Sequence, residues 1–137
     1  GADVKDRRVK EVPFLLYDGQ HLPLGDNEFD VVFLSYVLHH CQNSVSVMTE
    51  AKRVAKDKII VFEDEAQGFF TKSMGYFHQV TYNLFFQKKN QVFNFKTKEE
   101  WRGIFQKLGL RVIFQKNIFP RLYWLFPQRR ILFVLEK

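Results

Sequence analysis

The sequence predicts an α/β fold in which a mostly parallel sheet is covered by helices and followed by a C-terminal antiparallel strand pair. Short apolar runs alternate with segments of helical spacing, an order typical of strands joined by crossover helices. The runs are nearly uninterrupted, as strands buried on both faces require. The 137 residues, 46% of them hydrophobic and 16 of them Phe, suffice for one core.

The first half of the chain predicts two strands, a helix and a further strand. Residues 12–17 form an apolar run that stops at Asp18-Gly19, and residues 29–36 form a second run. Apolar residues then recur at helical spacing between residues 44 and 55, and residues 58–62 return to strand character. This order predicts right-handed crossovers between parallel strands.

The second half contains the clearest helix of the sequence. Thr97 and Glu100 make a capping box, and Gly109 supplies the C-terminal stop. The apolar residues between them are spaced for one helical face: Trp101, Ile104, Phe105 and Leu108. Residues 110–115 and 131–135 then read as strands, and we expect them to pair antiparallel because no crossover helix separates them.

Composition narrows the function classes. The single cysteine, Cys41, excludes an internal disulfide and favours a reducing, cytoplasmic setting. The net charge of +6 is compatible with a nucleic-acid partner. The Lys and Arg residues are scattered along the sequence, however, and no RNA-recognition or helix-turn-helix signature accompanies them. We therefore do not expect nucleic acid to be a partner, and such binding would weaken steeply with salt. Residues 31–38, the longest apolar run, fall far short of the ~20 residues of a membrane span.

Polar residues follow each predicted strand of the first half. Asp18-Gly19 follows the first run, His39-His40 the second, and Glu63-Asp64-Glu65 the third. Ligands of α/β sheets bind outside the carboxyl ends of the strands. These turns are therefore the predicted functional site.

The motifs together resemble the small-molecule type of class I S-adenosylmethionine-dependent methyltransferase. They cover nearly the whole chain: Asp18-Gly19, Leu22-Pro23-Leu24, Asp26 to Val32, Val37 to His40, Glu50, Arg53-Val54, Thr97, Glu100, Trp101, Phe105 and Gly109. The resemblance implies a Rossmann-like sheet with helices on both faces and methyl transfer from S-adenosylmethionine to a small-molecule acceptor. Residues 1–137 are then one partial domain, with residues 66–96 at the place of the substrate-recognition insertion.

The resemblance also assigns cofactor-binding residues. Asp3 would bind the ribose hydroxyls, Asp18 the adenine amino group, and the Gly19 backbone would approach the adenine ring. Ser35 and Tyr36 would lie beside the methionine part. Two simpler interpretations remain open, namely that Asp3 is a solvated terminal residue and that Asp18 only forms an ordinary Asp-Gly turn.

His40 and Asp64 are the predicted catalytic residues. His39 and His40 would lie over the site mouth, where the near-neutral pKa of a histidine allows His40 to act as a general base. Asp64 would favour the sulfonium charge. Alternatively, one histidine satisfies backbone groups at the turn, and residues 63–65 are a solvated acidic turn. A metal site is not expected, because adjacent histidines point apart and a third ligand is missing.

Two aromatic segments suggest further contacts. Residues 69–95 are rich in Phe and Tyr, which suits an apolar substrate pocket as well as ordinary helix packing. Residues 118–130 mix aromatic residues with Arg121, Arg129 and Arg130, a composition that suits peripheral contact with a membrane.

A glycine loop is the one family motif that this sequence lacks. No two of its seven glycines are spaced as in GxG, and in the family this loop and the first strand precede the acid corresponding to Asp3. We therefore expect this chain to be an incomplete form that binds S-adenosylmethionine weakly or not at all, with exposed strand edges that favour self-association. The alternative function is a non-catalytic interaction module that pairs through its open sheet edge.

Overall fold

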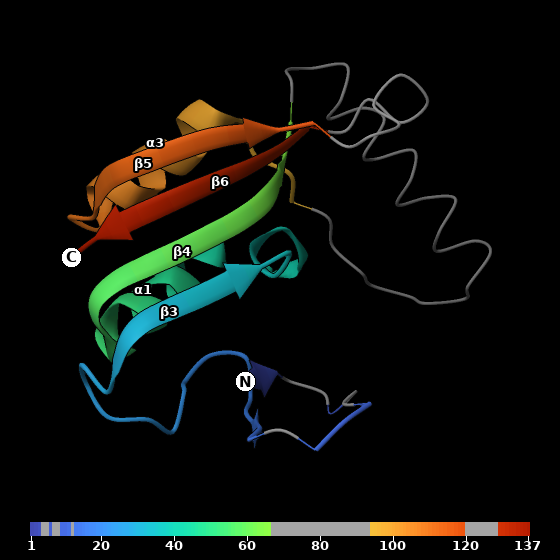
Figure 1. The fold of residues 1–137 in the computed structure, drawn as a ribbon, viewed down its shortest axis with the longest axis vertical. Helices are drawn as coiled ribbons and strands as arrows, with labels where there is room; N and C mark the ends of the chain where they lie inside the picture. The colour runs from blue at the N-terminus through green and yellow to red at the C-terminus, as the bar shows by residue number, and fades with distance from the viewer. Residues whose placement is uncertain (4–5, 7–8, 12, 67–93, 120–128) are drawn as a thin grey trace.

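The computed structural model describes residues 1–3, 6, 9–11, 13–66, 94–119 and 129–137 (Figure 1). Its elements are β1 (Ala2–Asp3), β2 (Leu15–Leu16), β3 (Phe29–Ser35), the short 3₁₀ helix η1 (Leu38–His40), α1 (Ser44–Val54), β4 (Ala55–Glu65), α3 (Lys98–Lys107), β5 (Arg111–Ile118) and β6 (Arg129–Glu136). The predicted order of strands and helices is confirmed for these residues. The aromatic segment at 69–95, except its last two residues, and nearly all of the expected insertion at 66–96 lie outside the described residues.

The described strands form two sheets. β1 and β2 are a parallel pair, and the larger sheet has the order β3-β4-β6-β5. β3 runs parallel to β4, with α1 as the crossover, whereas β6 is antiparallel to both β4 and β5. The parallel crossover and the antiparallel C-terminal pair agree with the sequence prediction. Among the described strands nothing pairs with the outer edge of β3, so the two sheets remain separate.

The core lies between the larger sheet and its two α-helices. The Asn43 side chain caps α1 by accepting hydrogen bonds from the backbone of Val45 and Ser46. α3 begins with the predicted capping box of Thr97 and Glu100. The apolar faces of both helices pack on the same side of the sheet, in one cluster with residues of β4 and β6: Met48, Ala51, Ile59, Val61, Trp101, Phe105, Ile131, Phe133 and Leu135.

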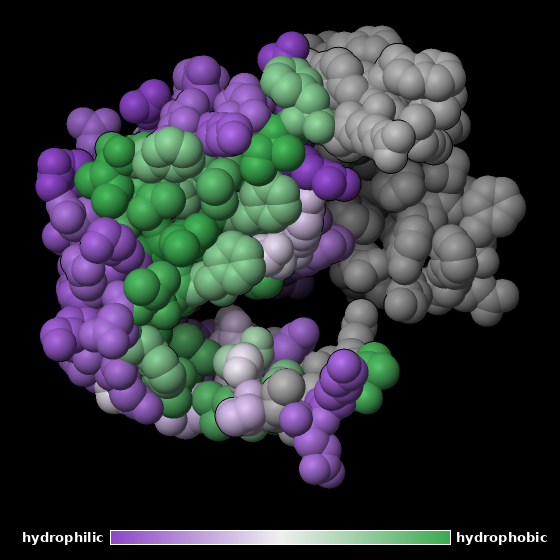
Figure 2. Space-filling model, in the orientation of Figure 1, coloured by the Kyte–Doolittle hydropathy of each residue, from purple (hydrophilic) through white to green (hydrophobic). Residues whose placement is uncertain are grey.

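The opposite face of the larger sheet is apolar and uncovered in the part that the structure describes. Strand register aligns Phe33, Ile60, Val134 and Phe114 in one row across the four strands. Phe33 is 60% exposed and Phe114 49% exposed. Figure 2 shows apolar side chains gathered across this face, with a hydrophilic margin around much of it. Helices on both faces are what the family resemblance implies, and among the described residues they cover one.

Candidate functional site

The carboxyl ends of β3 and β4 lie side by side. Ser35 is in register with Phe62, and the backbone nitrogen of Tyr36 donates a hydrogen bond to the Phe62 carbonyl at 2.9 Å. Parallel pairing therefore brings the residues after β3 beside the last residues of β4. Ser35, Tyr36 and Asp64, which the sequence analysis singled out, meet at this edge.

Tyr36 has the left-handed backbone conformation, with φ of 53°. This conformation is unfavourable for a residue with a bulky side chain and often marks a functional position. The Tyr36 ring packs edge-on against Phe62, at 5.0 Å between centroids. Its hydroxyl is buried and has no hydrogen-bond partner among the described residues. Burial raises the pKa of this hydroxyl, which keeps it protonated and able to donate.

Arg130 lies between Tyr36 and Asp64. Its guanidinium carbon is 5.7 Å from the centre of the Tyr36 ring, and its Nε is 3.9 Å from Oδ1 of Asp64, the residue opposite it in register. Burial raises the pKa of the Asp64 carboxyl, although His39 and Arg130 oppose the shift. A carboxylate with a raised pKa is a better proton acceptor than an ordinary one. Sequence reasoning found Asp64 but did not assign Arg130 to the site, because only the antiparallel register brings it there.

Glu63 holds the turn after β3. Its side chain is fully buried, and Oε1 accepts hydrogen bonds from the backbone nitrogens of Val37 at 2.9 Å and Leu38 at 2.8 Å. Oε2 lies 2.5 Å from Nδ1 of His39. The His39 ring is also buried and stacks on Phe95, at 5.1 Å between centroids. Glu63 is therefore part of the buried scaffold under η1.

The two histidines occupy different environments. His39 is 4% exposed and contacts Glu63, so it does not lie over the site mouth as expected. The expectation was wrong because the residues of a 3₁₀ turn point in different directions. The His39 side chain points inward and contacts the buried carboxylate of Glu63. His40 ends η1 on the exposed side, with its ring centroid 4.1 Å from that of His39. Its role as a general base stays a prediction.

The predicted cofactor residues of the N-terminal segment lie on the smaller sheet and the turn after it. Asp3 ends β1 and is exposed. Oδ1 of Asp18 accepts hydrogen bonds from the backbone of Gln20 at 2.7 Å and His21 at 2.8 Å, and these bonds lower the pKa of the carboxyl. Gly19 has φ of 82°, a conformation that requires glycine in this tight turn. Asp18 thus forms the ordinary Asp-Gly turn, with Oδ2 outside these two bonds.

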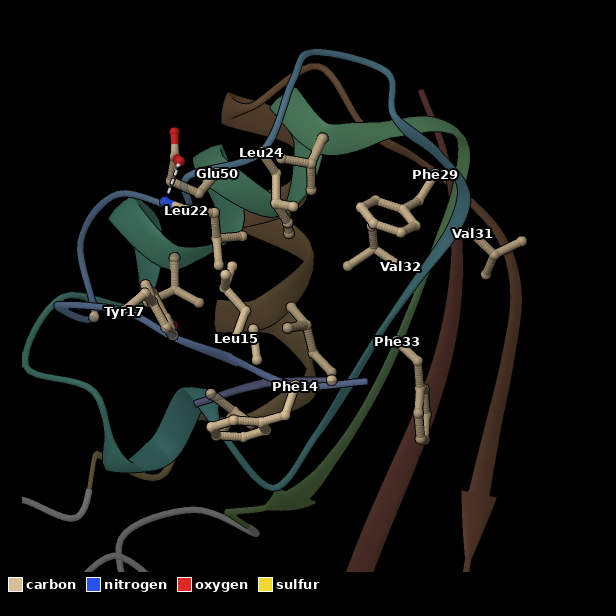
Figure 3. Close-up of a pocket in the computed structure, with 18 of the residues that line it drawn as sticks. Phe14, Leu15, Tyr17, Leu22, Leu24, Phe29, Val31, Val32, Phe33 and Glu50 are labelled. Atoms are coloured by element: carbon tan, nitrogen blue, oxygen red, sulfur yellow. Dashed lines mark hydrogen bonds between the residues drawn. The ribbon is translucent and has the colours of Figure 1, made fainter. Parts of the chain in front are cut away.

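A cavity of ≈ 490 Å³ separates the N-terminal segment from β3 and α1. Phe14, Leu15 and Leu22 line it from one side, with Phe29 and Val32 of β3 among its other walls (Figure 3). Gly19 and Val37 also line it, so the turn after β2 and the turn after β3 border the same space. The walls are mainly apolar.

Arg53 and Glu50 of α1 fasten the loop before β3. The Arg53 guanidinium donates hydrogen bonds to the carbonyls of Leu22 at 2.9 Å and Leu24 at 2.7 Å, and to Asp26 at 2.8 Å. Glu50 accepts from Arg53 and from the Leu22 nitrogen, at 2.8 and 2.9 Å through Oε2. These contacts lower the pKa of Glu50 to about 2. The i, i+3 spacing of Glu50 and Arg53 in the sequence indicates that the two side chains can pair. The sequence does not indicate that both also bind the loop before β3.

Comparisons with known proteins place these features in context. Residues 2–62 match a family model described as a methyltransferase domain. No curated protein matches the chain significantly. The described part of the chain contains no helix that is both long and apolar enough to cross a membrane.

Solved structures share the fold at low sequence identity. An S-adenosylmethionine-dependent methyltransferase from Thermotoga maritima matches with a TM-score of 0.65 and 18% identity, over 92% of this chain and 64% of that protein. One from Methanosarcina mazei matches with 0.65 and 13%, over 90% and 66%. The [4+2]-cyclase SpnF matches with 0.64 and 13%, over 90% and 55%. The chain thus spans less than two thirds of these relatives, and the fold by itself does not fix the reaction.

Proposed function

We propose that the chain is part of a class I S-adenosylmethionine-dependent methyltransferase and serves methyl transfer to a small-molecule acceptor. The match of residues 2–62 to a methyltransferase-domain model and the fold shared with solved methyltransferases support this proposal. The reaction would be in-line attack of an acceptor atom on the sulfonium methyl. Positioning and exclusion of water supply most of the rate in such transfers. The edge formed by Tyr36 and Asp64 is the site that we assign to the acceptor.

The residues that we assign to the methyl donor have the chemical groups that S-adenosylmethionine needs. S-adenosylmethionine supplies an electrophilic methyl group on a positively charged sulfur. Asp3 would bind the ribose hydroxyls, and Oδ2 of Asp18, which the turn does not use, would accept from the adenine amino group. Gly19 exposes backbone without a Cβ, so the adenine ring can approach it closely. Ser35 and Tyr36 would lie beside the methionine part.

His40 and Asp64 would act on the acceptor. Asp64 lies at the end of β4, where its carboxylate favours the sulfonium charge or accepts a proton. His40 is exposed at the end of η1 and could accept a proton only from a substrate that reaches this surface. We propose residues 66–96 as the segment that recognises the acceptor and residues 118–130 as a candidate membrane contact, and most of each segment lies outside the described residues.

The observation that carries the proposal is the Tyr36–Asp64 edge, where a strained backbone, an unsatisfied hydroxyl and a carboxylate of raised pKa coincide. The test is transfer of a labelled methyl group from S-adenosylmethionine to a small-molecule extract by the protein expressed from its complete gene. Asp64→Asn should lower the rate at least about tenfold. An Asp57→Asn control, at an exposed position far from the edge, should leave it unchanged. Absence of transfer by the wild-type protein would reject the proposal.

The second candidate is a non-catalytic interaction module that pairs through an open sheet edge. The specific observation in its favour is the outer edge of β3, which is unpaired among the described strands and borders the apolar cavity. Such an edge presents backbone donors and acceptors to another chain. The same edge would support self-association.

A further inference from the structure

Two buried hydrogen-bond donors at the carboxyl edge of the larger sheet lack acceptors in the part of the chain that the structure describes. They are the hydroxyl of Tyr36 and the Nε–H of Arg130. Buried polar groups are nearly always hydrogen-bonded, and an exception calls for an explanation, such as a catalytic role or a group that binds there. The guanidinium carbon of Arg130 lies 5.7 Å from the centre of the Tyr36 ring, so the two donors belong to one cluster.

Asp64 supplies the third group of this cluster. Its Oδ1 stands 3.9 Å from Nε of Arg130, which is beyond a normal hydrogen bond. The carboxylate is 20% exposed and pairs in register with Arg130, so it faces the same edge. A carboxylate accepts protons but, when ionised, donates none. The cluster therefore offers two donors and one acceptor.

A ligand hydroxyl group matches these two hydrogen-bond donors and one acceptor. Its oxygen accepts hydrogen bonds from two donors while its own hydrogen is donated to a carboxylate. An ammonium group has no lone pair for Tyr36 and Arg130, and a carboxylate ligand would be repelled by Asp64. The apolar wall beside the cluster, formed by Phe62 and by Leu132, its neighbour in register, suits an aromatic ring.

We propose that Tyr36, Asp64 and Arg130 bind the hydroxyl of a phenolic acceptor, whose oxygen receives the methyl group. The inference rests on the proposed methyl transfer and names its acceptor class. The phenol oxygen forms a bond to the methyl carbon, the carbon–sulfur bond breaks with its electron pair remaining on sulfur, and the phenol proton passes to Asp64. Arg130 stabilises the negative charge that grows on the oxygen, and a phenol, with a pKa near that of tyrosine at about 10, loses its proton more readily than an alcohol.

Binding of small probes to the 137-residue chain tests the site separately from catalysis. The probes are p-cresol, benzylamine and toluene, which share a ring and differ in the group it carries, the amine being an ammonium ion at neutral pH. Ligand-observed NMR should give p-cresol an affinity at least about fivefold above that of either other probe, as one additional satisfied buried hydrogen bond predicts. Equal affinities, or no binding of p-cresol, would overturn the proposal.

Conservative variants assign the contacts. Tyr36→Phe and Arg130→Gln should each weaken p-cresol binding at least about fivefold without changing toluene binding. Arg111→Gln, at the far end of β5, is the matched control and should have no effect. Unchanged p-cresol affinity in both site variants would contradict the proposal even if the protein methylates other acceptors. Specific p-cresol binding without methyl transfer would instead retain the phenol site and reject the proposed reaction.

Discussion

The buried carboxylate of Glu63 holds His39 through a contact of 2.5 Å between Oε2 and Nδ1. Its other oxygen accepts two backbone hydrogen bonds of the same turn. One side chain of β4 thus fixes the turn that follows Tyr36. The geometry of the proposed site depends on this link, although Glu63 is itself fully buried.

Replacement of Glu63 should destabilise the protein. Glu63→Ala leaves two backbone N–H groups and His39 without their acceptor, so the free energy of unfolding should fall by about 2–4 kcal/mol. Glu63→Gln keeps an amide oxygen for the backbone and should cost about half as much. Urea unfolding measures both values. An exposed control, Glu99→Gln, should change stability by less than about 0.5 kcal/mol, and equal losses in Glu63→Ala and this control would contradict the role of Glu63.

The Glu50–Arg53 pair should make stability depend on pH in the acid range. Hydrogen bonds from Arg53 lower the pKa of Glu50 from 4.5 to about 2 in the folded chain. A lowered folded-state pKa means that the contribution is complete above pH 4.5 and is lost as pH falls toward 2. The free energy of unfolding should therefore fall more steeply over this window in the wild type than in Glu50→Gln. Arg53→Met should flatten the dependence similarly, and parallel curves for all three proteins would exclude the pair as the cause.

The capping box of α3 gives a prediction with an internal control. Thr97 accepts a hydrogen bond from the Glu100 nitrogen at 3.2 Å, and its loss in Thr97→Ala should lower the free energy of unfolding by about 1 kcal/mol. Thr49→Ala removes a threonine within α1 whose hydroxyl bonds to the Val45 carbonyl of its own helix. That change should be neutral or slightly stabilising, because alanine has the higher helix propensity. Thermal unfolding would refute the assignment if both variants lost equal stability.

The exposed edge strand β3 predicts self-association. Phe33 is 60% exposed on this strand, and a lysine there would oppose edge pairing and remove apolar surface. Sedimentation velocity should show concentration-dependent association of the wild-type chain and its reduction in Phe33→Lys. The control Val45→Lys replaces an exposed residue of α1 and should associate like the wild type. A wild-type chain that stays monomeric at all concentrations would weaken the interaction-module alternative.

Local patterns in the sequence were sufficient for most of the fold. The capping box at Thr97 and the apolar run of β3 depend on nearby residues, and both appear as predicted. β4 is longer than the expected residues 58–62, because it starts directly at Ala55 after α1 and ends at Glu65, with partners on β6 up to that residue. Long-range pairing of this kind is not visible in a single strand's composition.

The candidate site was predictable only in part, for the same reason. Tyr36 directly follows β3 and Asp64 lies among the last residues of β4, so the rule for parallel sheets located them. Arg130 reaches them only through the position of β6 between β4 and β5. The separate environments of His39 and His40 depend on the burial of Glu63, whose acidic neighbours suggested a solvated turn.

Chemical-shift mapping with S-adenosylmethionine tests the central claim most directly. Titration into the isotope-labelled 137-residue chain should shift the amide signals of Gly19, Ser35 and Tyr36, with a dissociation constant of about 1 mM or weaker because the chain lacks a glycine loop. Adenosine should reproduce the shift at Gly19 but not those at Ser35 and Tyr36. Shifts confined to other parts of the molecule would contradict the assignment of this edge to methyl transfer.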